Sequence, residues 1–176
     1  MLAFSAAAPA SLRPVLDALD PSPAYVNDLC WRVLAWNRAA DAVFGYTSLP
    51  DDERNSLLLM FTRREMRARI VDWEAVAARM VATFRMSVGP YLGDATVEAL
   101  LARLHTSADF TRLWQQHDVG VRRAGRKAMR HPALGDLVFD HQAFQVIDAP
   151  ALRLVVYTPV DESTRRACAA AGEERS

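Results

Sequence analysis

The chain has 176 residues, of which 51% are hydrophobic and 24% are charged, a composition typical of one ordinary globular domain. Its 21 basic residues balance 21 acidic residues, so the net charge is zero and gives no general attraction to nucleic acid or to an anionic membrane surface. No apolar run reaches the roughly 18 residues that suggest a transmembrane helix, so we expect no membrane contact and a cytoplasmic location.

Residues 1–10 are small and apolar but lack the basic start of a signal peptide. We expect them to be a disordered lead-in or a remnant of the expression vector. The folded domain is expected over residues 11–165, beginning with a short helix at Leu12–Leu19 that Ser11 can cap. A charged C-terminal tail is expected over residues 166–176.

A strand that runs directly into a capped helix is the most informative local pattern of the chain. Two short strands are predicted at Ala24–Asn27 and Cys30–Trp36, and a helix at Arg38–Phe44 follows them. Asn37 stands at the joint, where its side-chain oxygen can accept a bond from a helical N–H that has no other partner. Gly45 follows at the position where a left-handed residue commonly ends a helix.

The middle of the chain is expected to be helical. The apolar run Asn55–Phe61 predicts a buried helix, and Thr62 is expected to cap the next one at Arg63–Ile70. Asp72 is expected to cap the longest helix, which runs from Trp73 to about Val88. Apolar residues recur along that helix at spacings of three and four, which predicts a single buried stripe: Trp73, Val76, Ala77, Met80, Phe84 and Val88.

The last third of the chain returns to strands. Two shorter helices are predicted at Thr96–His105 and after Ser107. A basic stretch at residues 122–130 is most simply a solvated hairpin, with a contact to an anionic head group or to DNA as the alternatives. Two longer strands are predicted at Leu134–Ile147 and Leu152–Thr158.

The order of the predicted elements indicates the fold class. Strands come first, helices follow, and strands return before a C-terminal helix that Asp161 can cap. Such segregation favours an α+β fold with one antiparallel sheet over alternating βαβ units. Strands from both ends of the chain would have to share that sheet.

The sequence holds no pattern typical of a catalytic or metal-binding site. No phosphate-binding glycine loop, G-x-G-x-x-G, H-E-x-x-H or C-x-x-C motif occurs. None of the four histidines lies at a metal-ligand spacing from another ligating residue. We therefore expect no metal, no cofactor and no enzymatic activity, unless a nucleophile is assembled from distant residues.

A series of motifs resembles the ligand-binding domain of MmyB-like transcription regulators. The motifs, in chain order, are Pro23–Val26, Trp31–Ala40, Asn55–Leu58, Phe61, Asp72–Glu74, Phe110-x-x-Leu113-Trp114-x-x-His117-Asp118-Val119, Lys127-x-x-Arg130-His131-Pro132-x-x-Gly135 and Leu152-x-Leu154–Thr158. The resemblance spans about residues 11–160. It implies a PAS-like antiparallel sheet covered by a layer of helices. It also implies a small apolar ligand, with a long-chain fatty acid as the leading candidate.

The resemblance leads us to expect a pocket between the sheet and the helical layer. The residues expected to line it are Trp36, Phe44, Leu58, Phe61, Trp73, Ala77, Met80, Phe84, Trp114 and His117. Each of these side chains could equally belong to an ordinary core or, for His117, to a structural contact. Arg63 and Arg130 are the candidate contacts for a carboxylate head group.

The resemblance also implies partners. Members of the family usually carry a helix-turn-helix domain before the sensor, and the few residues that precede the match here cannot hold one. DNA binding is therefore expected only through a helix-turn-helix domain absent from this chain. The alternative function is a dimerisation or partner-binding module without a small ligand, with a homodimer as the expected assembly.

Overall fold

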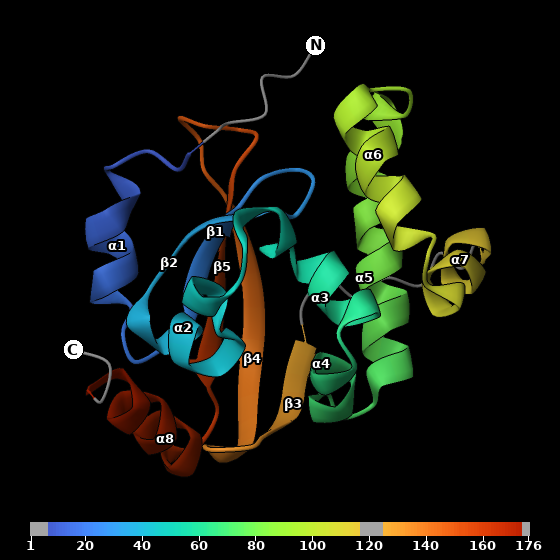
Figure 1. Ribbon diagram of the computed structural model, residues 1–176. Helices are drawn as coiled ribbons and strands as arrows, with labels where there is room; N and C mark the ends of the chain where they lie inside the picture. Colours follow the sequence, from blue (N-terminus) through green and yellow to red (C-terminus); the bar gives the residue numbers. More distant parts are fainter. Residues whose placement is uncertain (1–6, 117–124, 174–176) are drawn as a thin grey trace.

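The structure, a computed structural model, describes residues 7–116 and 125–173 of the chain. Within them, five strands form one antiparallel sheet in the order β2-β1-β5-β4-β3 (Figure 1). The strands are β1 (Ala24–Asn27), β2 (Val33–Trp36), β3 (Gly125–His131), β4 (Gly135–Gln145) and β5 (Arg153–Pro159). The pairing of β1 with β5 joins the two ends of the chain, so the predicted α+β, PAS-like sheet is confirmed.

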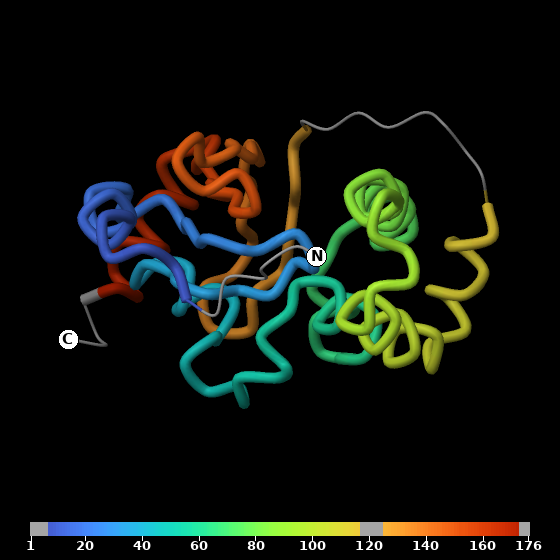
Figure 2. The backbone as a smooth tube through the Cα atoms, turned by 90° about the horizontal axis from the view of Figure 1, so that it is seen from above, coloured from blue at the N-terminus to red at the C-terminus, as the bar shows by residue number. Residues whose placement is uncertain are grey.

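Helices lie on both sides of this sheet. They are α1 (Leu12–Ala18), α2 (Arg38–Phe44), α3 (Ser56–Thr62), α4 (Arg64–Arg69), α5 (Trp73–Val88), α6 (Ala95–Leu104), α7 (Ala108–Gln115) and α8 (Glu162–Glu173), with short 3-10 turns at Tyr46–Ser48, Asp51–Glu53 and Gly89–Tyr91. Seen from above, α5, α6 and α7 form a body to one side of the sheet, and α3 and α4 lie between the two (Figures 1 and 2). No helix of the described residues is long and apolar enough to cross a membrane.

Three apolar clusters hold these layers together. The helical core packs α3, α5, α6 and α7 around the fully buried Phe84 and Phe110. The inner face of the sheet packs against α2 and α8, with Phe139 at its centre. A smaller cluster packs α1 through Leu16 against Val26 and its neighbours on the outer face. The helical body thus has a core of its own, separate from the sheet.

Asn37 caps α2 as predicted and also joins three elements. Its side chain is only 1% exposed, and its Oδ1 accepts bonds from the backbone N–H groups of Ala40 at 2.9 Å and Ala24 at 3.0 Å. Its Nδ2 donates to the carbonyl oxygens of Leu16 at 3.2 Å and Ser22 at 2.9 Å. One buried amide therefore ties α1 and the start of β1 to the first turn of α2.

Several local predictions differ from the structure. Ser11 and Asp72 make no side-chain capping bond at the starts of α1 and α5, and Asp72 has a left-handed backbone with φ 54°. Strand β2 begins at Val33 and not at Cys30, because Trp31 adopts a left-handed backbone with φ 63° that interrupts the extended chain. Thr62 does not cap α4, since its hydroxyl donates back to the carbonyl oxygen of Leu58 at 2.7 Å within α3.

The basic stretch forms a strand over its described part. Gly125–His131 is strand β3 at the edge of the sheet, and residues 122–124 lie outside the described residues. The free edge of β3 is partly covered, because the backbone N–H of Val71 donates to the carbonyl oxygen of Ala128 at 3.0 Å and Ile70 bridges to Met129. This contact attaches the α4–α5 connection to the sheet.

The C-terminal helix is longer than the sequence indicated. Asp161 caps α8 as predicted, with its Oδ1 accepting from the backbone N–H of Thr164 at 2.7 Å. The helix continues to Glu173, through most of the segment expected to be a charged tail. Cys168 and Ala171 are buried, since small side chains allow α8 to pack closely against α2.

We predict that Asn37→Ala destabilises the fold by about 3 kcal/mol, because it removes a cap and leaves buried backbone groups without partners. Ser107→Ala serves as the control, since Ser107 also caps a helix but makes one capping bond, to the N–H of Phe110. Its expected cost is about 1 kcal/mol. Urea unfolding followed by circular dichroism measures both; equal costs would show that the additional bonds of Asn37 contribute nothing.

Candidate functional site

A cavity of about 720 Å³ lies between the sheet and helices α3, α4 and α5. Its size falls within the range usual for small-molecule sites. From the sheet come Tyr25 and Asn27 of β1, Arg153, Val155 and Tyr157 of β5, Phe139, His141, Ala143 and Gln145 of β4, and Lys127 and Met129 of β3. From the helices come Phe44, Ser56, Leu59, Met60, Met66, Val76, Arg79, Met80, Thr83, Met86 and Ser87.

The register of the antiparallel sheet explains why these sheet residues share the cavity. Tyr25 pairs with Val155, and Tyr157 pairs with His141 on the next strand. Residues directly opposite each other in a sheet present their side chains on the same face, and alternate residues along a strand do so too. The inner face of four strands therefore forms one continuous wall.

Methionines form a large share of the apolar part of the wall, together with aromatic and aliphatic residues. Of the six methionines in the chain, five line the cavity: Met60, Met66, Met80, Met86 and Met129. Methionine is unbranched and polarizable, so it adapts to apolar partners of different shape. The wall is therefore suited to a flexible apolar group rather than to one rigid ligand.

The charged residues of the wall are all basic. Arg79, Lys127 and Arg153 line the cavity, and no aspartate or glutamate is among the described residues that do. Lys127 is the only lysine of the chain. Since the chain as a whole carries equal numbers of acids and bases, the cavity concentrates positive charge locally.

Lys127 is held at the cavity surface by a tyrosine instead of an acid. Its Nζ lies 3.3 Å from the hydroxyl oxygen of Tyr157 and 5.2 Å from the centroid of that ring. No carboxylate of the described residues pairs with it. Burial, and to a smaller extent the charge of Arg79, lowers the pKa of Lys127 from 10.5 to about 8.

Three tyrosines form a buried cluster beside Lys127. The ring of Tyr25 lies 5.6 Å from that of Tyr46 and 6.2 Å from that of Tyr157, measured between centroids. Burial raises the pKa of all three phenols above its usual value. The hydroxyl groups therefore stay protonated at neutral pH and can donate hydrogen bonds.

His141 completes the polar part of the sheet wall. Its ring lies 4.9 Å from that of Tyr157 between centroids. Burial, followed by the charge of Lys127, lowers the pKa of His141 to about 3. The imidazole is consequently neutral at physiological pH and adds no further positive charge.

Three buried polar atoms of wall residues have no hydrogen-bond partner among the described residues. They are Oδ1 of Asn27, Nε1 of Trp31 and Oγ of Ser56, and all three residues line the cavity. An unpaired buried polar group costs free energy unless a water molecule or a ligand meets it. Trp31 also holds the strained left-handed backbone described above, a feature that clusters at functional sites.

The predicted lining residues divide between the cavity and other parts of the fold. Phe44 and Met80 line the cavity. Trp36 lies beyond Tyr46, where its Nε1 donates to Oγ1 of Thr47 at 3.3 Å, and does not reach the cavity wall. His117 lies outside the described residues.

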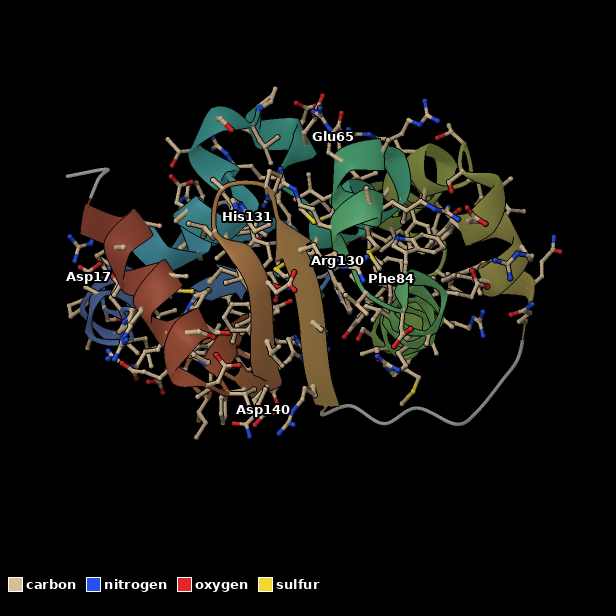
Figure 3. The ribbon with its side chains drawn as sticks, turned by 90° about the horizontal axis from the view of Figure 1, so that it is seen from below. Asp17, Glu65, Phe84, Arg130, His131 and Asp140 are labelled. Atoms are coloured by element: carbon tan, nitrogen blue, oxygen red, sulfur yellow. The ribbon has the colours of Figure 1, made fainter. Side chains whose placement is uncertain are left out.

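The other predicted residues belong to the helical core, away from the cavity lining: Leu58, Phe61, Trp73, Ala77, Phe84 and Trp114. Phe61 packs edge-on against Trp73 at 5.6 Å between centroids, and Figure 3 shows Phe84 among the helices. Helix α5 is covered on two sides, with Trp73 and its neighbours facing α6 and α7 while Arg79 faces the cavity. Helical spacing indicates which positions are buried and not what buries them.

The two predicted head-group contacts lie elsewhere. Arg63 forms an ion pair with Glu53 at a separate small pocket of about 270 Å³. Arg130 is exposed on the outer face of β3, opposite to the side that carries Lys127. The position of Lys127 was not predicted, although strand alternation across Lys127 and Met129 was a usable indication.

The described residues hold no group of three or more His, Cys, Asp or Glu side chains that could bind a metal ion. The polar chemistry of the described lining comes from one amine and two guanidinium groups, together with neutral hydroxyls, side-chain amides and the imidazole of His141. Such a set can bind an anion and orient it, and it surrounds that anion with apolar surface.

The low pKa of His141 predicts a loss of stability in mild acid. Between pH 6.5 and 3 the unfolded chain binds a proton at this residue and the folded chain does not, so stability falls as the pH falls. From pH 7 to pH 5 the wild type should lose about 2 kcal/mol more than His141→Gln. Urea unfolding at both pH values measures the difference, and parallel losses in the two proteins would contradict the assignment.

The comparison with known families agrees with this geometry. The family described as the MmyB-like transcription regulator ligand binding domain matches residues 8–171, nearly the whole chain. A comparison with curated proteins gives no match. The chain therefore belongs to the family of MmyB-like transcription regulator ligand-binding domains.

Proposed function

We propose that this domain is a non-enzymatic sensor whose ligand is an apolar chain with an anionic head, such as a long-chain fatty acid. The observation that carries the proposal is a cavity with an adaptable apolar wall, three basic residues and no carboxylate among its described lining. The domain would act in the cytoplasm and reach DNA through a separate helix-turn-helix domain.

The apolar wall would supply most of the affinity. Burial of one methylene group contributes about 0.8 kcal/mol, so ten buried methylenes would contribute about 8 kcal/mol before the costs of association. The five methionines can follow the bends of such a chain. This apolar contribution to the affinity does not require specific polar contacts along the alkyl chain of the ligand.

The head group would bind where the protein lacks a counter-charge. A carboxylate beside Lys127 would neutralise a partly buried ammonium group, and Arg79 from α5 lies close enough to affect the same charge. The hydroxyl of Tyr157, which accepts a bond from Lys127, could donate its own proton to the anion. These contacts would favour an acid over a neutral ligand of the same length.

The alternative, a partner-binding module without a small ligand, accounts less well for the cavity. A module that acts only through its surface has no use for a lysine without a carboxylate partner, such as Lys127, or for unpaired polar atoms in an internal wall. Such groups lower stability unless a ligand compensates them.

We predict that Lys127→Met weakens the binding of tetradecanoate by about 10- to 100-fold, the value of one lost charge-assisted contact. Methionine keeps the length and apolar surface of the side chain, so the affinity for tetradecanol should change little. Isothermal titration of the delipidated protein with both compounds, below their aggregation concentrations, measures the difference.

Arg130→Met is the matched control, because it removes a positive charge from the same strand on its outer face. It should leave both affinities unchanged. Absence of tetradecanoate binding to the wild type would overturn the fatty-acid proposal. Equal losses in Lys127→Met and Arg130→Met would overturn the assignment of the head-group site.

A further inference from the structure

We propose that Lys127 is also a covalent capture site, at which an apolar aldehyde condenses with the side-chain amine and is held in the cavity as an imine. The inference rests on the proposed function only in that both place an apolar chain in this cavity. It concerns a different class of ligand and a different protonation state of the same residue.

The surroundings of Lys127 favour the nucleophilic form of the amine. The side chain is enclosed by the cavity wall, with the positive charge of Arg79 nearby and no carboxylate of the described residues to pair with it. Desolvation and a neighbouring cation are the two conditions that activate lysines toward carbonyl compounds. With a pKa of about 8, roughly a tenth of the amine is unprotonated at pH 7.

Tyr157 is placed to assist the reaction. Its hydroxyl lies 3.3 Å from Nζ, so a carbonyl oxygen on a carbon bonded to Nζ would lie within reach of the phenol. Burial keeps the phenol protonated, and it can therefore donate a hydrogen bond to that oxygen as negative charge develops. The phenol would act as a positioned donor and proton carrier.

The step balances without any further reagent. The lone pair of Nζ forms a bond to the carbonyl carbon, the C=O electron pair moves to oxygen, and a proton transfer gives a neutral carbinolamine. Nitrogen then forms a double bond to that carbon as the hydroxyl group leaves. The two amine hydrogens and the aldehyde oxygen depart as water, and nothing is oxidised or reduced.

The cavity would supply selectivity for long chains. An aldehyde with a long alkyl chain gains the same burial against the methionine wall as a fatty acid. It would therefore be held beside the amine at high effective concentration, which a short aldehyde would not. Exclusion of water by the chain would also slow hydrolysis of the imine.

The two ligand classes require opposite responses to pH. Carboxylate binding uses the ammonium form of Lys127 and should weaken above pH 8, whereas condensation uses the free amine and should accelerate from pH 6.5 to 8.5. The titratable groups that face Lys127 do not change their charge in this pH range, since the pKa of His141 is about 3 and burial raises the pKa values of Tyr25 and Tyr157 above 10. The charged group that faces it from α5 is the guanidinium of Arg79.

The test treats the delipidated full chain with dodecanal, followed by borohydride to reduce any imine to a stable amine, and then intact-mass and peptide mass spectrometry. Since Lys127 is the only lysine, a single dodecyl group on its peptide is the expected product. Labelling should rise through pH 8, should fall at least about tenfold with propanal, and should be blocked by excess dodecanol.

The variant R126K/K127R is the matched control, because it moves the only lysine to the exposed outer face of the same strand. Its labelling should be at least about tenfold slower than that of the wild type. K127R alone measures any reaction at the N-terminal amine. Equal rates for wild type and R126K/K127R, adducts confined to the N-terminus, or no protection by dodecanol would overturn the inference.

Titration of the wild type with tetradecanoate separates this inference from the proposed function. Fatty-acid binding without aldehyde capture overturns only the inference. Capture without fatty-acid binding overturns only the anionic ligand. Failure of both would show that the cavity does not accept alkyl chains.

Discussion

The antiparallel pairing of β1 with β5 is the constraint on which the site depends. It joins the two ends of the chain at the centre of the sheet, with Tyr25 opposite Val155 and Asn27 opposite Arg153. A slip of one residue would turn every inward side chain of the strand to the outer face. The tyrosine cluster, the unpaired Asn27 and the basic residues would then no longer face one another.

The cavity persists because the helical body does not need the sheet to bury its own apolar surface. Phe84 and Phe110 are fully buried within the helices, and Phe139 is fully buried on the sheet. Two cores that are packed separately can leave a gap where they meet. Such a gap costs less free energy of folding than a void of the same size within one core. The contact of Ile70 and Val71 with the edge of β3 then fixes the distance between them.

The sequence was sufficient for features that local chemistry decides. The caps Asn37, Ser107 and Asp161 were predicted because each satisfies nearby backbone N–H groups, and the order of elements indicated the α+β sheet. The caps expected at Ser11, Thr62 and Asp72 on the same ground were wrong, because none of these side chains makes a capping bond. The lining of the cavity could not be derived in this way. Helical spacing identified Trp73 and Met80 as buried alike. Only the tertiary packing places Trp73 within the helical core and Met80 at the edge of that core, where it lines the cavity.

The position of Lys127 required two facts that no short segment contains. One is that residues 125–131 form an edge strand, which a basic composition does not suggest. The other is the register with β4, which pairs Lys127 with Phe139 and turns both inward while Arg126 and Arg130 face solvent. Sequence composition therefore indicated a basic segment, but only the register of the sheet shows which basic residue of that segment lines the cavity.

No carboxylate of the described residues compensates the charge of Lys127, and this charge would connect ligand binding to the distance between the sheet and the helical body. The residue lies on the sheet and Arg79 on α5, so two like charges face the cavity from opposite walls. Under the proposed function an anion between them would replace repulsion with attraction across the gap. A ligand shifts a conformational equilibrium only by its difference in affinity for the two states. An anion bound at this point would meet that requirement, because it contacts both walls only when sheet and helices are close.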